Sequence, residues 1–213
     1  MNQAKIQFRA VRPSDYSALS KIICDTWSYE RICTPKTAKA MSKLYLASCL
    51  TNQTFTCVAQ SQGEPVGIIM GKNESTHRTA PRYAFGQFTA ALAMLVTKEG
   101  RSVLKTFEGF DDINKALFSE NTQTFDGEVA FFAVRSDQRG TGVGKELFRR
   151  LRAAMEAQGI FDFYLYTDST CNYGFYEHQG MQRIGEKTVR LKAYQDKEMS
   201  FFMYGLHSAP QGT

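Results

Sequence analysis

The stretch 128–167 constrains the fold of this 213-residue chain more than any other part of the sequence. Residues 128–134 form a short apolar segment of strand length, and a glycine-rich turn follows at 139–144. Apolar residues then recur at helical spacing over 144–158, up to Gly159, and a second strand-like segment occupies 161–167. A strand, a helix and a strand in this order predict a β-α-β unit with parallel strands and a right-handed crossover. The sequence therefore predicts an α/β protein whose sheet is buried by helices.

The rest of the chain adds strands and helices around this unit. The clearest of these is a hairpin, because two alternating segments flank the turn Ser61-Gln62-Gly63-Glu64. The other segments are assigned from apolar periodicity and breakers, and the expected elements are strands at 6–10, 54–60, 65–71, 182–191 and 199–205, and helices at 14–29, 37–49, 84–98, 101–107, 111–118 and 172–179. We therefore expect a mixed, partly parallel central sheet flanked by helices.

Length and composition fit one globular domain over residues 1–213, with an ordered core over about 5–205. Hydrophobic residues make up 43% and charged residues 22% of the chain, which is ordinary for a soluble domain. The longest apolar runs fall far short of the roughly 18 residues that a membrane span needs. The first residues alternate instead of forming the apolar block of a secretory signal. We therefore expect no membrane association and a cytoplasmic location.

Charge and cysteine usage narrow the possible partners. The formal net charge of +5 is mild, and no run of five or more basic residues occurs, so we expect no nucleic-acid partner. Five cysteines without a C-x-x-C pair and three scattered histidines give no metal-binding pattern. We expect reduced, mostly structural cysteines and no metal.

The turn Arg139-Gly140-Thr141-Gly142-Val143-Gly144 is the strongest candidate for a binding site. Its glycines leave backbone N–H groups uncovered at the start of a helix, where the helix dipole also favours an anion such as a pyrophosphate. A plain tight turn is the alternative. A Walker loop would need glycine at position 139 and serine or threonine at position 146, where Arg139 and Glu146 stand. A dinucleotide fingerprint fails in the same way at Lys145 and Leu147.

The same turn resembles the cofactor motif of the GCN5-related N-acetyltransferase (GNAT) superfamily, which is Arg or Gln, two residues, Gly, one residue, then Gly or Ala. The motif Asn172-Tyr173-Gly174-Phe175-Tyr176 resembles a second conserved segment of that family. The resemblance implies the acyl-CoA N-acyltransferase fold, acetyl-CoA as cosubstrate and no metal. The residues that it implies for cofactor binding are Phe132, Ala133, Val134, Arg139, Gly140, Thr141, Gly142, Val143, Gly144 and Asn172.

Two residues are candidates for catalysis. The resemblance implies Tyr176 as the general acid that protonates the leaving thiolate, and the alternative is a ring that only packs beneath the cofactor. Strand alternation predicts Glu128 on the face of Phe132 and Val134. A carboxylate at this position resembles that of the histone-type members of the family, and this resemblance implies Glu128 as the general base that deprotonates the amine, often through water. The alternative for Glu128 is a solvated residue at the start of a strand. The four-residue spacing of Asn172 and Tyr176 predicts that both lie on one helix face.

These residues together favour an N-acetyltransferase that moves an acetyl group from acetyl-CoA to a primary amine by direct attack in a ternary complex. The acceptor is a small molecule or a protein, and Tyr164, Tyr166 and Asp168 are candidates for the acceptor cleft. The alternative function is a non-catalytic module of the same fold that binds or senses acyl-CoA. An edge strand near the C-terminus is a possible homodimer contact.

Overall fold

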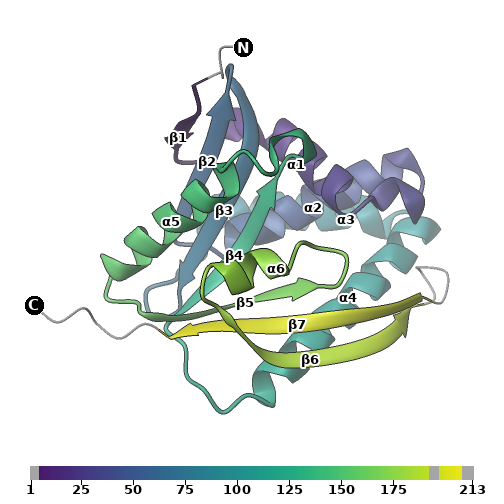
Figure 1. The fold of residues 1–213 in the computed structure, drawn as a ribbon. Helices are drawn as coiled ribbons and strands as arrows, with labels where there is room; N and C mark the ends of the chain where they lie inside the picture. Colours follow the sequence, from purple (N-terminus) through teal and green to yellow (C-terminus); the bar gives the residue numbers. More distant parts are fainter. Residues whose placement is uncertain (1–4, 192–196, 208–213) are drawn as a thin grey trace, which may run out of the picture.

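A seven-stranded sheet forms the centre of the molecule, with the strand order β1-β2-β3-β4-β5-β7-β6 (Figure 1). The computed structural model describes residues 5–191 and 197–207. The strands are β1 (Gln7–Arg9), β2 (Phe55–Ser61), β3 (Glu64–Asn73), β4 (Gly127–Val134), β5 (Asp162–Asp168), β6 (Gln182–Leu191) and β7 (Lys197–His207). β4 and β5 are parallel, and the other neighbouring strands are antiparallel. The predicted mixed sheet is thus confirmed.

Helices cover both faces of this sheet. They are α1 (Tyr16–Thr26), α2 (Pro35–Thr51), α3 (Pro81–Leu95), α4 (Lys98–Ser119), α5 (Val143–Glu156) and α6 (Gly174–His178), with 3-10 turns at Pro13–Asp15, Tyr29–Arg31 and Ser136–Gln138. The apolar stripe of α5, with Leu147 and Leu151, packs against Ile69 on one face. On the other face α1 and α2 pack against Ile68 and Met70. Figure 1 shows α5 on one side of the strands and α1 and α2 on the other.

The hairpin of β2 and β3 has the turn that its sequence predicts. Gln62 and Gly63 have φ angles of 50° and 86°. Positive φ at both central residues is the requirement of the type I′ turn, one of the two-residue turns that match the twist of a hairpin.

The prediction of two separate helices at 101–107 and 111–118 is wrong, because α4 runs without a break from Lys98 to Ser119. Phe107 and Phe110 pack into the hydrophobic clusters on either side of Gly109, and this packing offsets the low helix propensity of glycine. The backbone N–H of Gly100 donates to the Thr97 side chain over 2.9 Å and caps the helix.

A β-bulge in β4 changes the faces that its side chains occupy. Phe131 lies opposite Met70 and Glu128 opposite Lys72, so β4 has one more residue than β3 between these pairs. Val129 consequently packs in the hydrophobic cluster between the sheet and α5, and Phe131 packs in the cluster between the sheet and α1 and α2. Phe132 lies on the α5 face again. The expectation that strict alternation places Glu128 on the face of Phe132 is therefore wrong.

None of the helices in the described parts of the chain is long and apolar enough to cross a membrane.

Candidate active site

The parallel strands β4 and β5 separate after their first residues. Gly127 pairs with Phe163 and Glu128 with Tyr164, and the register ends there although the strands continue to Val134 and Asp168. Both strands therefore have backbone groups at their C-terminal ends that are not used in pairing with each other. In Figure 1 the ends of β4 and β5 point apart.

A cavity of about 540 Å³ lies at this separation. Residues 129–132 of β4 and 165–168 of β5 form one part of its wall, and α2, α3 and α4 supply most of the rest, together with Trp27 and Tyr29, which follow α1. Among the sequence-predicted residues, Phe132, Tyr176, Tyr166 and Asp168 line the cavity. The volume is within the range of sites that hold small molecules.

The glycine turn follows β4 and leads into α5. Gly140 and Gly142 have φ angles of 78° and 90°, and the space where a Cβ would stand is open at both. In the described parts of the chain, the loop hydrogen bonds include none donated by the backbone N–H of Gly140, Thr141 or Gly142. These donors and the N-terminal end of α5 are a suitable cradle for the pyrophosphate of acetyl-CoA.

The turn also lies next to the cavity wall. A Cβ on Gly144 would stand 3.4 Å from Cζ of Phe132, so the start of α5 and the wall approach closely. Val143 is buried, and Ala133 is buried on the opposite face, in the cluster of α1 and α2. The backbone of Ala133, and not its side chain, is therefore the part that can face a ligand in the gap.

Tyr176 is the predicted catalytic residue that the structure places in the cavity wall. Its ring centroid lies 6.4 Å from that of Phe132 and 5.9 Å from that of Tyr204. Burial raises the pKa of Tyr176, and the nearby Cys171 and Asp168 raise it further. The phenol therefore keeps its proton throughout the neutral range.

Asn172 does not share a helix face with Tyr176, because α6 begins only at Gly174. Its side chain is exposed, and its carbonyl accepts a hydrogen bond from the backbone N–H of Phe175 over 3.2 Å. The expected helix at 172–179 is thus shorter than predicted at its start.

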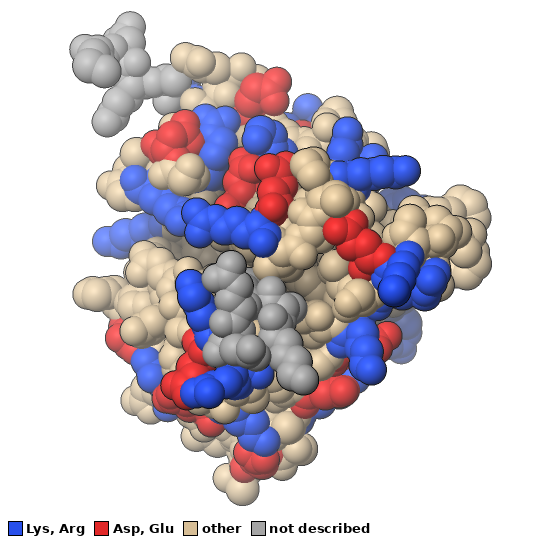
Figure 2. Space-filling view, turned by 90° about the vertical axis from the view of Figure 1, so that its right-hand side faces the viewer, with Lys and Arg blue, Asp and Glu red and all other residues tan. Residues whose placement is uncertain are grey.

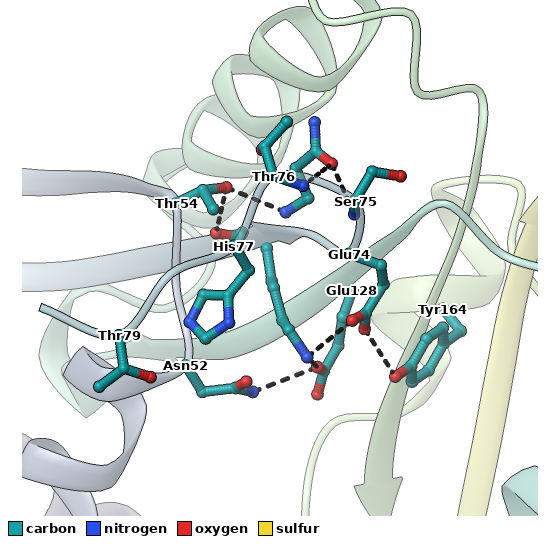
Figure 3. Close-up of polar contacts among 12 residues, drawn as sticks. Asn52, Thr54, Glu74, Ser75, Thr76, His77, Thr79, Glu128 and Tyr164 are labelled. Carbon is teal, nitrogen blue, oxygen red and sulfur yellow. Dashed lines mark hydrogen bonds and ion pairs between the residues drawn. The ribbon is translucent and has the colours of Figure 1, made fainter. Parts of the chain in front are cut away.

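Glu128 is not among the described residues that line the cavity, although the next residue, Val129, is. Figure 3 shows the Glu128 side chain turned towards Asn52. Its Oε2 accepts a hydrogen bond from Nδ2 of Asn52 over 3.2 Å and lies 3.8 Å from Nζ of Lys72. The ammonium of Lys72 also lies 2.8 Å from Glu74. Burial raises the pKa of Glu128, and the charge of Lys72 opposes that shift. The solvated alternative does not hold, because Glu128 is largely enclosed by these neighbours.

Asp168 is a second carboxylate, and it lines the cavity itself. The residue is 7% exposed, and its Oδ1 accepts a hydrogen bond from the backbone N–H of Thr170 over 2.7 Å. Its Oδ2 lies 3.7 Å from the thiol of Cys171. The structure thus brings Asp168 and Tyr176 to one cavity and leaves Glu128 outside the lining.

Sequence reasoning missed several lining residues, including Trp27, Tyr45, Asp111, Asn114 and Cys171. Trp27 fell on a predicted apolar helix face, where a core position is the simpler interpretation. Asn114 and Asp111 lie three residues apart within the predicted helix at 111–118, which already places them on one face, but no local pattern marks that face as part of a cavity. The described residues hold no group of three or more His, Cys, Asp or Glu side chains that could bind a metal.

The comparisons with known proteins agree with this geometry. The model of the acetyltransferase (GNAT) family matches residues 107–181, which include β4, the glycine turn, α5, β5 and Tyr176. The chain is similar in structure to an N-acetyltransferase from Staphylococcus aureus Mu50, with a TM-score of 0.55 and 15% identity over 96% of this chain and 99% of that one. It is also similar to the ribosomal-protein-S18-alanine N-acetyltransferase from Escherichia coli, with a TM-score of 0.54 and 12% identity over 98% and 99%. At these identities the likeness shows the fold. No curated protein sequence matches the chain.

Proposed function

We propose that this chain is an N-acetyltransferase of the GNAT superfamily that moves an acetyl group from acetyl-CoA to a primary amine, because residues 107–181 match the GNAT family model and the chain shares the fold of solved acetyltransferases. The observation that carries the proposal is the separation of β4 and β5 next to a glycine turn with open N–H donors. A cavity joins the two strand ends and contains both a tyrosine and a carboxylate. The amine that accepts the acetyl group belongs to a small molecule or to a protein.

We propose that the glycine turn holds the pyrophosphate through its backbone N–H groups. Gly140 and Gly142 supply the positive φ angles that aim these donors outward. The free backbone of residues 132–134 would hold the pantetheine arm between the strands. Asn172 is proposed as a further contact on the resemblance alone.

The chemistry needs one proton to move. Acetyl-CoA supplies an acetyl group that is activated as a thioester. Transfer forms a bond between the amine nitrogen and the carbonyl carbon and breaks the bond between that carbon and sulfur. The nitrogen loses one proton in this step, and the departing thiolate gains one. The enzyme must remove the first proton and supply the second.

Tyr176 is proposed as the donor of the proton to the thiolate. Its raised pKa ensures that the phenol is protonated at neutral pH, and a thiol near its ordinary pKa of about 8.5 is protonated at that pH. Tyr176 lies in the cavity wall, near the rings of Phe132 and Tyr204.

Glu128 is proposed as the base that removes the proton from the amine. Because Glu128 is not among the described residues that line the cavity, the proton would pass to it through water. A raised pKa makes a carboxylate a stronger base, which suits this role.

Direct transfer is favoured over an acetyl-cysteine intermediate. Cys171 is the cysteine that lines the cavity, and burial together with the charge of Asp168 raises its pKa to about 11. The thiol is therefore protonated at neutral pH and is a poor nucleophile.

The experiment that tests this function has two parts. Acetyl-CoA should raise the melting temperature, because a ligand that binds only the folded state stabilises it. Release of CoA thiol is then measured with and without amines. A protein that is stabilised by acetyl-CoA and yet releases no thiol with any amine would instead support the non-catalytic acyl-CoA-binding module.

A homodimer is a separate proposal about assembly. β6 is an edge strand of the sheet, and α3 exposes the apolar side chains of Phe85, Phe88 and Leu92. Copies of the chain would associate through these two surfaces. The mass of the protein in solution, measured by light scattering, tests the homodimer.

A further inference from the structure

The lining of the cavity carries an inference about the acceptor, which rests on the proposed function. We propose that the acceptor is a small organic amine cation with an aromatic body and without a carboxylate. The cavity walls supply the aromatic surface, the negative charge and the hydrogen-bond acceptors that such a molecule needs.

The aromatic surface comes from several separate elements. Trp27 follows α1, Tyr45 lies on α2 and Phe131 on β4, and all three line the cavity. The ring of Trp27 lies 5.5 Å from that of Tyr45 and 6.0 Å from that of Phe131, measured between centroids. Grouped rings bind an aromatic body by stacking and attract a cation to their faces.

The charge of the lining is of one sign. Glu108, Asp111 and Asp168 contribute carboxylates, whereas Lys, Arg and His are absent from the lining in the described part of the chain. The whole chain carries a net charge of +5, so the lining has the opposite sign from the protein. Figure 2 shows basic and acidic side chains interspersed on the outer surface. The negatively charged lining favours a cation and repels the carboxylate of an amino acid.

Two lining groups can accept hydrogen bonds from an ammonium. Oδ1 of Asp168 accepts a hydrogen bond from Thr170, whereas among the described residues the donor to Oδ2 is the weak thiol of Cys171 at 3.7 Å. Oδ1 of Asn114 is buried and has no hydrogen-bond partner among residues 5–191 and 197–207. A buried acceptor without a donor is costly, and an N–H group of a bound amine would satisfy it.

The decisive comparison uses two substrates that differ by one carboxylate. Phenethylamine and phenylalanine are offered with acetyl-CoA, and kcat/KM is measured for each by release of CoA thiol. We expect phenethylamine to be preferred by about 100-fold or more, because like charges brought together cost several kcal/mol. Equal rates, or a preference for phenylalanine or for a peptide with an N-terminal phenylalanine, would overturn the inference while the proposed function stands.

Binding can be measured without turnover, because Trp27 is the only tryptophan of the chain and lines the cavity. Phenethylamine is titrated into the protein while tryptophan fluorescence is recorded. A saturable change is expected with phenethylamine and not with phenylalanine. If acetyl-CoA is never turned over but this change occurs, the function fails and the acceptor site stands. If amines are acetylated but phenethylamine causes no saturable change, the inference fails.

Two variants locate the cation. Asp168→Asn keeps an oxygen for the bond to Thr170, so the turn is preserved while the charge is lost. It should weaken the binding of phenethylamine about 10-fold or more, as expected for loss of a hydrogen bond to a charged group. Asp111→Asn should weaken binding by a smaller factor, since Lys115 lies 2.6 Å from that carboxylate.

Asp112→Asn is the matched control. Asp112 is the neighbour of Asp111 on the same helix, its side chain is 78% exposed, and it lies near the same Lys115. It is not part of the lining. Unchanged phenethylamine binding in Asp168→Asn and Asp111→Asn, with circular dichroism showing a folded protein, would contradict the proposed position of the cation.

Discussion

The guanidinium of Arg139 donates a hydrogen bond from Nε to the carbonyl oxygen of Val134 over 3.2 Å. The first residue of the glycine turn is thereby tied to the last residue of β4. Because β4 no longer pairs with β5 at this point, the bond fixes the relative position of the strand end and the turn. The two parts of the proposed cofactor site are thus held together by one side chain.

The glycine turn gives the first prediction. Gly142→Ala places a side chain at a φ of 90°, which should cost about 1–2 kcal/mol of stability and displace the N–H donors of the turn. Gly63→Ala is the control, because Gly63 has a φ of 86° in the hairpin turn, far along the chain from the site. Both variants should lose stability in urea, but only Gly142→Ala should lose affinity for acetyl-CoA in calorimetry. Equal affinities would argue against the turn as the pyrophosphate site.

Tyr176→Phe should lower kcat about 100-fold or more with little change in KM, because it removes a proton donor of the reaction and no binding surface. In the wild type, the raised pKa of Tyr176 predicts no loss of kcat from its ionisation near pH 10. Tyr173→Phe is the control on the same segment, since Tyr173 packs near Arg183 and is outside the lining. If the two variants turn over equally fast, Tyr176 is not the acid.

Glu128→Gln should lower kcat by about 100-fold and remove the acidic limb of the pH profile. A base must be deprotonated to act, so activity rises with pH through its pKa. Because the pKa of Glu128 is raised, this limb should lie above the ordinary value of 4.5. Glu74→Gln removes the other carboxylate near Lys72 and should retain the limb. A limb that persists in Glu128→Gln would exclude this residue as the base.

The folding of the N-terminal region should depend on Asp15. Its carboxylate lies 2.7 Å from the guanidinium of Arg9 and accepts a hydrogen bond from the backbone N–H of Arg12 over 2.8 Å. Burial alone would raise the pKa of Asp15, but these hydrogen bonds lower it. A lowered pKa gives stability that is complete above the unfolded value of about 3.9 and is lost as the pH falls through the folded value.

Asp15→Asn should therefore cost about 3 kcal/mol at pH 7, since it leaves a largely buried guanidinium without its partner, and the difference should shrink below about pH 4. Urea unfolding at several pH values measures this. Asp25→Asn, which removes an exposed pair with Lys21 at 3.1 Å, should change stability by about 0.5 kcal/mol or less. A difference for Asp15→Asn that does not depend on pH would contradict the lowered pKa.

Alkylation tests the state of Cys171. With a pKa raised to about 11, its thiol should react slowly with iodoacetamide at pH 8, and Cys171→Ser should retain acetyl transfer. Mass spectrometry of the protein mixed with acetyl-CoA should show no acetylated Cys171. A stable acetyl group on this cysteine would indicate a two-step transfer.

Local patterns predicted much of the fold. A short stretch of sequence is enough to predict positive φ and apolar periodicity. It therefore predicted the turn at Gln62 and Gly63 and the β-α-β unit that contains Gly140 and Gly142. The extent of α4 was not predictable in the same way. Its continuity across Gly109 depends on Phe107 and Phe110 packing against distant parts of the chain.

In the candidate site, too, local motifs were predicted and long-range contacts were not. Tyr176 and Phe132 were found because they belong to contiguous motifs, and the structure places both in the cavity wall. The face of Glu128 was predicted wrongly, because an extra residue in β4 breaks the alternation and no local pattern marks it. Trp27, which follows α1, and Asn114, on α4, reach the cavity from segments remote in sequence, so only the tertiary structure identifies them.

Acetyl transfer is tested most directly by the release of CoA thiol from acetyl-CoA by the purified wild-type protein, with and without phenethylamine. We expect release that depends on the amine and saturates with it, together with N-acetylphenethylamine in an amount equal to the thiol. If acetyl-CoA binds to the folded protein and no amine in a broad panel, phenethylamine included, increases thiol release, the proposed acetyl transfer is contradicted.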